Sequence, residues 1–284
     1  MTNNQLIKSA SYASVVTAII IMIVKSYGWL STDSQSILAS LIDSLLDVTS
    51  SAINLVAVRV ALTPPDNNHR FGHEKFQDLA IFAQSGFFFI SSLVILYSSS
   101  KALYLKQIPE NSELGADVMY ICIFFTLILV IYQTYVFNKT QSKIIAADKL
   151  HYFSDFLTNI AVVVSLYLSN SFWYLDALMG IFIALYIMKG SVSLFREAIR
   201  NLSDEEFDND QRDKIIKIIE NCPDVKGFHD LKTRFAGNKP FIQLHLELEG
   251  SLSLYKAHDI SEHVEQKIRA EFSKAEVTIH QDPV

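Results

Sequence analysis

Cysteine is scarce in this sequence, and no run of basic residues interrupts it. Only two cysteines occur among its 284 residues, Cys122 within an apolar stretch and Cys222 far along the chain. So small a number excludes a disulfide framework and a cysteine-rich zinc module. The formal net charge is −6, and this acidic balance argues against nucleic acid as a partner.

Proline is also rare, whereas apolar residues are abundant. The chain has six prolines and 19 phenylalanines, and 50% of its residues are hydrophobic. This composition is typical of a membrane protein rather than of a soluble enzyme. The first apolar stretch follows Lys8 and exceeds the core of a signal peptide, with no obvious small-residue cleavage site. We therefore expect it to be retained as a membrane span.

Six stretches are long and apolar enough to cross a bilayer, since a helix needs about 20 residues to span about 30 Å of hydrocarbon. They are residues 8–30, 36–62, 77–104, 114–137, 144–168 and 172–195. Basic residues gather in the connections on one side: Lys8, Arg59, Arg70, Lys75, Lys139, Lys143, Lys149, Lys189, Arg196 and Arg200. The positive-inside rule then predicts that both termini are cytoplasmic.

The composition changes abruptly at about residue 204. An acidic linker leads into an amphipathic helix, and residues 225–235 and 241–250 alternate as half-buried strands do. A second amphipathic helix and a last strand follow, within residues 253–272 and 275–283. The order helix, strand, strand, helix, strand favours a small α+β domain in the cytoplasm. We expect a transmembrane domain over residues 1–203 and a metal-binding α+β domain over residues 204–284.

Two pairs of polar residues stand at helical spacing inside apolar spans. The second span contains Asp43 and Asp47, and the fifth contains His151 and Asp155. Residues four apart share a helix face, and an aspartate at the bilayer centre costs about 2.5–3.5 kcal/mol on insertion scales. Facing pairs would present three carboxylates and one imidazole, a set that suits tetrahedral Zn²⁺. The alternative is that they only hydrogen-bond helices together, which we disfavour because of that cost.

The loop after the second span offers another group of possible ligands. Asp66, His69 and His73 lie close together there, and Gly72 permits a tight turn. These three side chains could bind one ion. The competing interpretation is that they are ordinary solvated residues of a surface loop.

The C-terminal domain holds a third group. Its candidate ligands are His229, His245, His258, His280 and Asp282. His245 falls on the polar face of an alternating strand, and His280 and Asp282 fall on one face of the last strand. We therefore expect a metal site in this domain, although isolated histidines are most often surface residues.

Taken together, these motifs resemble the cation diffusion facilitator family, and specifically its bacterial zinc and ferrous-iron efflux members. The sequences DSLLD and HYFSD, which begin at Asp43 and His151, match the family's DxxxD and HxxxD motifs. The loop sequence DNNHRFGH matches a second family site, at Asp66, His69 and His73. The resemblance covers nearly the whole chain.

The resemblance implies further properties. It implies a homodimer in the bacterial inner membrane, a metallochaperone-like C-terminal fold, and a binuclear zinc site at the five C-terminal candidates. It also implies a charge link between Lys75 and an acid after the sixth span, for which Asp204 is the candidate. Leu150, just before His151, resembles a hydrophobic gate position.

The expected function is proton-coupled export of Zn²⁺, with Cd²⁺ and Fe²⁺ as other candidate ions, and not an enzymatic reaction. Carboxylates and neutral imidazole bind metal, whereas their protonated forms do not, and His151 is the natural pH-sensitive member of the set. Two alternatives from other classes are a membrane metalloenzyme, with water as a zinc ligand, and a metal-sensing membrane receptor. Four protein ligands without an evident general base argue against the enzyme.

Overall fold

The structure is a computed structural model that describes residues 2–32, 35–106, 113–168 and 174–284. The chain divides into two compact units, Met1–Ala198 and Ile199–Val284. We call them the helical unit and the C-terminal unit.

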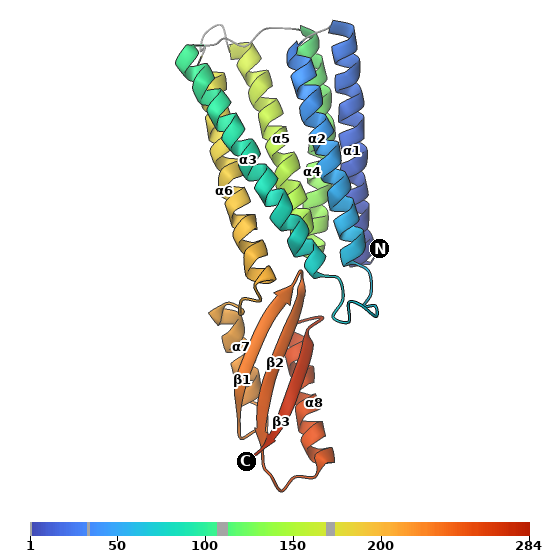
Figure 1. Ribbon diagram of the computed structural model, residues 1–284, viewed down its shortest axis with the longest axis vertical. Coiled ribbons are helices and arrows are strands. Elements are labelled where there is room, and N and C mark those ends of the chain that lie inside the picture. The colour runs from blue at the N-terminus through green and yellow to red at the C-terminus, as the bar shows by residue number, and fades with distance from the viewer. Residues whose placement is uncertain (1, 33–34, 107–112, 169–173) are drawn as a thin grey trace. The chain divides into compact units, whose positions relative to one another are not determined.

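In the described residues, the helical unit consists of long helices (Figure 1). They are α1 (Asn3–Thr32), α2 (Gln35–Ala61), α3 (Lys75–Leu105), α4 (Glu113–Thr140), α5 (Lys143–Leu168) and α6 (Leu175–Leu202). Each predicted span corresponds to one of these helices, which confirms the expected helical membrane bundle. Helices suit this environment because every backbone polar group is satisfied within the segment.

Four helical stretches within the described residues are long and apolar enough to cross a membrane: Asn3–Ser31, Lys75–Leu105, Asp117–Thr140 and Ala177–Leu202. They belong to α1, α3, α4 and α6. The other two helices, α2 and α5, are the ones that carry the polar pairs.

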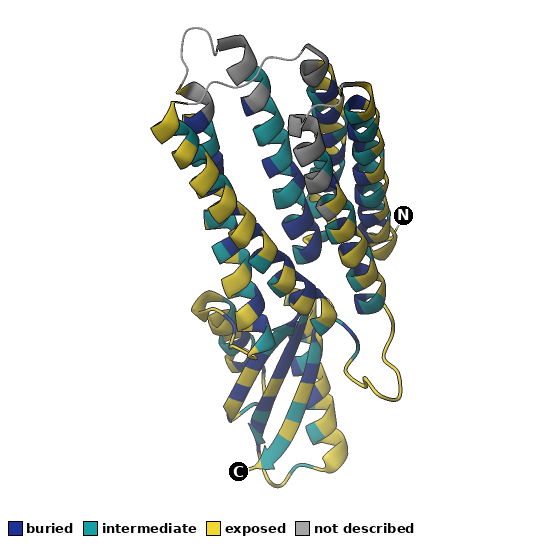
Figure 2. Cartoon of the chain, turned by 45° about the horizontal axis from the view of Figure 1, so that its top comes forward, coloured by how far each residue is buried: buried dark blue, intermediate teal, exposed yellow. Residues whose placement is uncertain are grey.

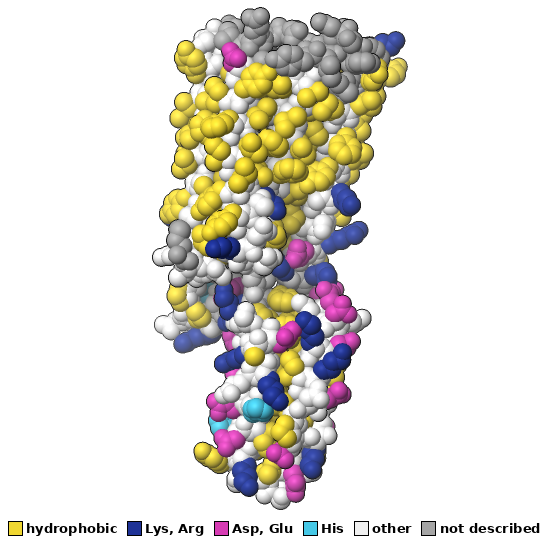
Figure 3. Space-filling model, turned by 180° about the vertical axis from the view of Figure 1, so that it is seen from behind, with side chains coloured by type: hydrophobic (Ala, Val, Ile, Leu, Met, Phe, Trp, Pro, Cys, Tyr) yellow, Lys and Arg dark blue, Asp and Glu magenta, His cyan; other side chains and the backbone are white. Residues whose placement is uncertain are grey.

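The surface of the helical unit is apolar, and polar side chains lie inside it. Phe87, Ile90 and Phe182 are each more than 60% exposed, and hydrophobic side chains dominate the face of this unit seen in Figure 3. Gln133 and Asp148, in contrast, are buried. This arrangement is expected where lipid is the solvent, because polar groups in hydrocarbon must find partners within the bundle.

The C-terminal unit has the predicted order of elements. It contains α7 (Asn209–Glu220), β1 (Gly227–Ala236), β2 (Lys239–Leu248), α8 (Leu254–Glu271) and β3 (Glu276–Pro283). The sheet order is β1-β2-β3, with β1 antiparallel to β2 and β2 parallel to β3. Helix α8 supplies the crossover that a parallel pair requires.

Both helices of this unit cover the same face of the sheet. Ile219 of α7 and Ile268 of α8 share one core with Ile242 and Leu246 of β2, and all four are fully buried. Buried and exposed residues alternate along the strands (Figure 2). The odd-numbered residues of β2, His245 among them, consequently lie on the face opposite to the helices.

A bulge in β1 decides which of its side chains reach that open face. His229 pairs with His245 and Lys232 pairs with Gln243, so β1 has one residue more than β2 between these pairs. Asp230 adopts a positive φ of 53° at this point. The extra residue shifts the alternation, so that Leu231 enters the core while His229 stays exposed on the open face.

We predict that Leu246→Ala destabilises the C-terminal unit by about 2–5 kcal/mol, because it leaves a cavity at a fully buried position. The control Leu254→Ala changes a residue that is 81% exposed, and its effect should stay within about 0.5 kcal/mol. Cys222 is buried in the same core as Leu246. Its thiol-labelling rate across a urea series, in a Cys122→Ser background, measures the change; equal rates in both variants would contradict the assigned core.

Candidate functional site

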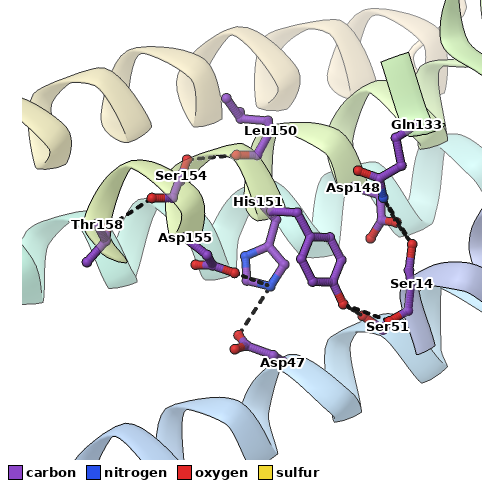
Figure 4. Close-up of polar contacts among 11 residues, drawn as sticks. Ser14, Asp47, Ser51, Gln133, Asp148, Leu150, His151, Ser154, Asp155 and Thr158 are labelled. Atoms are coloured by element: carbon purple, nitrogen blue, oxygen red, sulfur yellow. Dashed lines mark hydrogen bonds and ion pairs between the residues drawn. The ribbon is translucent and has the colours of Figure 1, made fainter. Parts of the chain in front are cut away.

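Three of the four predicted intramembrane ligands converge between α2 and α5. His151 Nε2 lies 3.2 Å from Asp47 Oδ1 and 3.6 Å from Asp155 Oδ2 (Figure 4). Ligand atoms of the three residues all lie within 4.8 Å of one another. The side chain of Asp43 lies outside the described residues, so its place as the fourth ligand stays a prediction.

Two aromatic rings fix the orientation of the His151 imidazole. Phe88 of α3 stacks on it with ring centroids 5.2 Å apart and an interplanar angle of 16°, and the Tyr152 ring lies 5.0 Å away. The side chain of His151 is only 14% exposed. Its Nε2 is buried and makes no well-formed hydrogen bond with any described residue. A buried nitrogen that faces two carboxylates fits a cation site.

A second polar cluster lies next to this site, and the sequence analysis missed it. Asp148 of α5 is buried, and its Oδ2 accepts hydrogen bonds from Ser14 Oγ of α1 at 2.5 Å and from Gln133 Nε2 of α4 at 2.7 Å. The hydroxyl of Tyr152 donates to the Ser14 carbonyl oxygen at 3.1 Å and contacts Ser51 Oγ of α2 at 2.6 Å. These hydrogen bonds connect α5 to α1, α2 and α4 through Asp148 and Tyr152, which stand on either side of His151 in the sequence (Figure 4).

The sequence held a signal for this cluster. Asp148 stands three residues before His151 inside the fifth predicted span, and Gln133 is a polar residue inside the fourth. A polar residue in an apolar span must find a partner. A four-residue spacing indicates only which side chains are neighbours on the same helix. It therefore does not predict the contacts of Asp148 with other helices.

The predicted gate residue lies beside α6. A Cβ atom added to Gly190 would come within 2.6 Å of Leu150 Cδ2. The absence of a side chain at Gly190 therefore allows Leu150 to pack closely against the α6 backbone. A gating role for Leu150 stays a prediction.

The loop residues also come together. Asp66 Oδ1 lies 3.3 Å from His69 Nδ1, Asp66 Oδ2 lies 3.4 Å from His73 Nε2, and the two imidazole rings are 4.5 Å apart. The backbone N–H of His69 donates to the Asp66 carboxylate and lowers its pKa. Gly72 adopts a φ of 98°, a conformation that favours glycine. The site has ligand types suited to a divalent cation, and its occupancy stays a prediction.

On the open face of the C-terminal sheet, three predicted ligands form a group. They are His229, His245 and Asp282. Asp282 Oδ2 lies 2.8 Å from His245 Nδ1 and 3.3 Å from His229 Nε2. The hydrogen bond from His245 lowers the pKa of Asp282. Two imidazoles and a carboxylate are a donor set that Zn²⁺ accepts.

The strand register explains this convergence. His245 is the cross-strand partner of both His229 on β1 and His280 on β3. His280 Nε2 lies 3.3 Å from Asp282 Oδ1, beside the group. His258 lies elsewhere, on α8, where its Nε2 is 3.9 Å from Glu262 Oε2. A role for His258 as a metal ligand stays a prediction.

The two residues of the predicted charge link belong to different units. Lys75 begins α3 in the helical unit. Asp204 lies in the C-terminal unit, where its Oδ1 is 3.1 Å from Arg234 Nη1. The link between them stays a prediction.

Comparison with known proteins identifies the family. The family model described as the cation efflux transmembrane domain matches residues 11–203. The model described as the cation efflux protein, cytoplasmic domain, matches residues 207–284. The chain belongs to the cation diffusion facilitator family. It is a cation efflux transporter and a multi-pass membrane protein, as the sequence motifs indicate.

Similar proteins span nearly its full length. Protein p34 of Rickettsia rickettsii is 57% identical over 282 residues, which cover 99% of this chain and 94% of that protein. The cation-efflux pump FieF of Shewanella oneidensis is 43% identical over 279 residues, with 98% and 94% covered. FieF of Serratia proteamaculans is 41% identical over 283 residues, with 98% and 93% covered.

For this transporter we predict that Asp148→Ala lowers the midpoint temperature of unfolding. The change removes the carboxylate that accepts from both Ser14 Oγ and Gln133 Nε2, and each lost hydrogen bond costs about 0.5–1.5 kcal/mol. Each donor keeps one other acceptor, the Ala10 carbonyl oxygen for Ser14 and Ser14 Oγ for Gln133. Asp148→Asn keeps one acceptor oxygen and should lose less. Thermal unfolding of the purified protein in detergent compares the two variants, and a midpoint in Asp148→Ala equal to wild type would contradict the network.

Proposed function

We propose that this cation efflux transporter exports Zn²⁺ from the cytoplasm in exchange for protons. The observation that supports the proposal most is the convergence of Asp47, His151 and Asp155 inside the helical unit, with ligand atoms within 4.8 Å of one another. With Asp43 as the proposed fourth ligand, the set contains three carboxylates and one imidazole. The imidazole favours Zn²⁺, since sites made only of oxygen suit harder ions such as Mn²⁺.

Proton coupling follows from the chemistry of the same ligands. They bind metal only in their deprotonated forms, so binding of Zn²⁺ releases protons and protonation releases Zn²⁺. We propose that the site loads from the cytoplasm and is protonated when it opens to a more acidic outside. Ligands contributed by two helices also make affinity depend on helix separation, because a small shift of α2 against α5 would pull the set apart.

We propose regulation through the C-terminal unit. The protein would act as a homodimer in the bacterial inner membrane, with both termini in the cytoplasm. Zinc bound at His229, His245 and Asp282 would stabilise one dimer arrangement when the ion is abundant, because a ligand shifts an equilibrium toward the state that it binds better. His258, His280 and the loop residues are proposed as further ligands. A receptor would keep the C-terminal site and move no ion, so ion flux separates the two functions.

The transport site is tested by Asp47→Ala. We expect the variant to fold and insert but to lose Zn²⁺ flux into proteoliposomes, because a carboxylate 3.2 Å from His151 Nε2 is removed. The matched control is Asp210→Ala, which removes an exposed carboxylate from α7 and should transport normally. Near-normal flux through Asp47→Ala would exclude this residue as a ligand.

Selectivity is tested by His151→Asp. Replacing the only imidazole of the proposed set with a fourth carboxylate should lower the preference for Zn²⁺ over Mn²⁺ and move the pH dependence of transport to the acid side, since no imidazole remains to titrate. The measurement is competitive metal flux across a pH series. His263→Asp, which changes an exposed histidine on α8, is the control. Unchanged selectivity together with an unchanged pH profile would mean that His151 is not a ligand.

A further inference from the structure

One carboxylate on the open face of the C-terminal sheet contacts a predicted ligand from the side away from the proposed ion. Glu247 Oε1 lies 2.9 Å from His229 Nδ1. The other ring nitrogen, His229 Nε2, lies 3.3 Å from Asp282 Oδ2. The two nitrogens of one imidazole therefore face two different carboxylates.

These contacts select one tautomer of His229. A neutral imidazole carries a single N–H, and the nitrogen that donates it cannot also bind a metal. With the proton on Nδ1, His229 donates to Glu247, and the lone pair of Nε2 is directed toward Asp282 and the proposed ion. Metal-binding histidines commonly donate their second N–H to a carboxylate, which fixes the ring and raises its basicity as a ligand.

The opposing strand leaves room for this carboxylate. Gly227 is the cross-strand partner of Glu247. A Cβ atom added to Gly227 would come within 2.4 Å of Glu247 Oε2. Even an alanine at this position would therefore push the carboxylate from its place beside His229.

We propose that Glu247 is a positioning residue for the cytoplasmic metal site, and that Gly227 provides the space it occupies. Glu247 holds His229 with Nε2 free to bind the ion and does not itself bind it. The inference rests on the proposed function, because it requires that His229, His245 and Asp282 bind a metal. The three candidate ligands group within 4.8 Å without Glu247.

The test measures zinc binding to the full-length protein in detergent by competition with a fluorescent chelator. An Asp47→Ala, Asp66→Ala background removes ligands of the other two proposed sites. We expect Glu247→Ala to weaken zinc binding by about 10- to 100-fold, the usual effect of losing such a partner, with the number of bound ions unchanged. Glu247→Gln keeps an acceptor oxygen for His229 Nδ1–H and should recover part of the affinity.

Two more variants examine the geometry. Gly227→Ala should weaken zinc binding in the same direction as Glu247→Ala, although it leaves every charged group in place. Glu249→Ala removes an exposed carboxylate that contacts Ser251 just beyond β2 and should bind zinc as the parent protein does. If Glu247→Ala and Glu249→Ala lost the same zinc affinity, the effect would come from net charge, and the proposal would be overturned.

Two other roles for Glu247, as a metal ligand or as a residue that only stabilises the sheet, would give different results. If Glu247 were itself a ligand, Glu247→Ala and Glu247→Gln would both reduce the number of bound ions. If Glu247 only stabilised the sheet, Glu247→Ala would raise the labelling rate of Cys222 in zinc-free protein, whereas we expect that rate to be unchanged. Either result overturns the positioning role, and so does wild-type affinity in Glu247→Ala.

His229→Ala and Asp282→Ala separate this inference from the proposed function. Both should abolish zinc binding at the C-terminal site. If both bind zinc normally, the site itself is wrong. If both lose zinc while Glu247→Ala binds it normally, the site stands and only the positioning role fails.

Discussion

The cost of placing carboxylates in a membrane governs the helical unit. Asp47 and Asp155 lie close to the same nitrogen of His151, at 3.2 Å and 3.6 Å, in a bundle whose outer surface is apolar. Charges in such surroundings persist where a counter-ion offsets their desolvation. A divalent cation can do this for several carboxylates at once, which protonation of a single imidazole cannot. If these residues form the proposed transport site, the same desolvation cost would favour the binding of a cation there.

A site of this kind depends on how rigidly its helices are held. Asp148 connects α5 to α1 and α4 through Ser14 and Gln133, and Tyr152 connects α5 to α2 through Ser51. Phe88 adds a stacking contact from α3. His151 lies between Asp148 and Tyr152 in a segment that is bonded to three other helices. Hydrogen bonds inside a membrane bundle are directional, so they restrict rotation of α5 about its axis as well as its separation from its neighbours.

The C-terminal unit uses a different means to bring its ligands together. Here the strand register supplies the geometry, since His229, His245 and His280 occupy equivalent positions on three adjacent strands. Core residues on the opposite face hold that register, because a slip by one residue would exchange the buried and exposed faces. The same leucines and isoleucines that stabilise the unit thus also align its candidate metal site.

The sequence by itself determined the spans, the order of elements and the pairs within one helix, because hydrophobic periodicity and four-residue spacing are local properties. It could not place Asp148 against Ser14 and Gln133, or Glu247 against His229, since these contacts join segments distant in the chain. Periodicity alone would also have put His229 and Leu231 on one face of β1. The bulge at Asp230 separates them. Only the pairing of β1 with β2 decides where the extra residue is accommodated, and therefore which histidine meets His245.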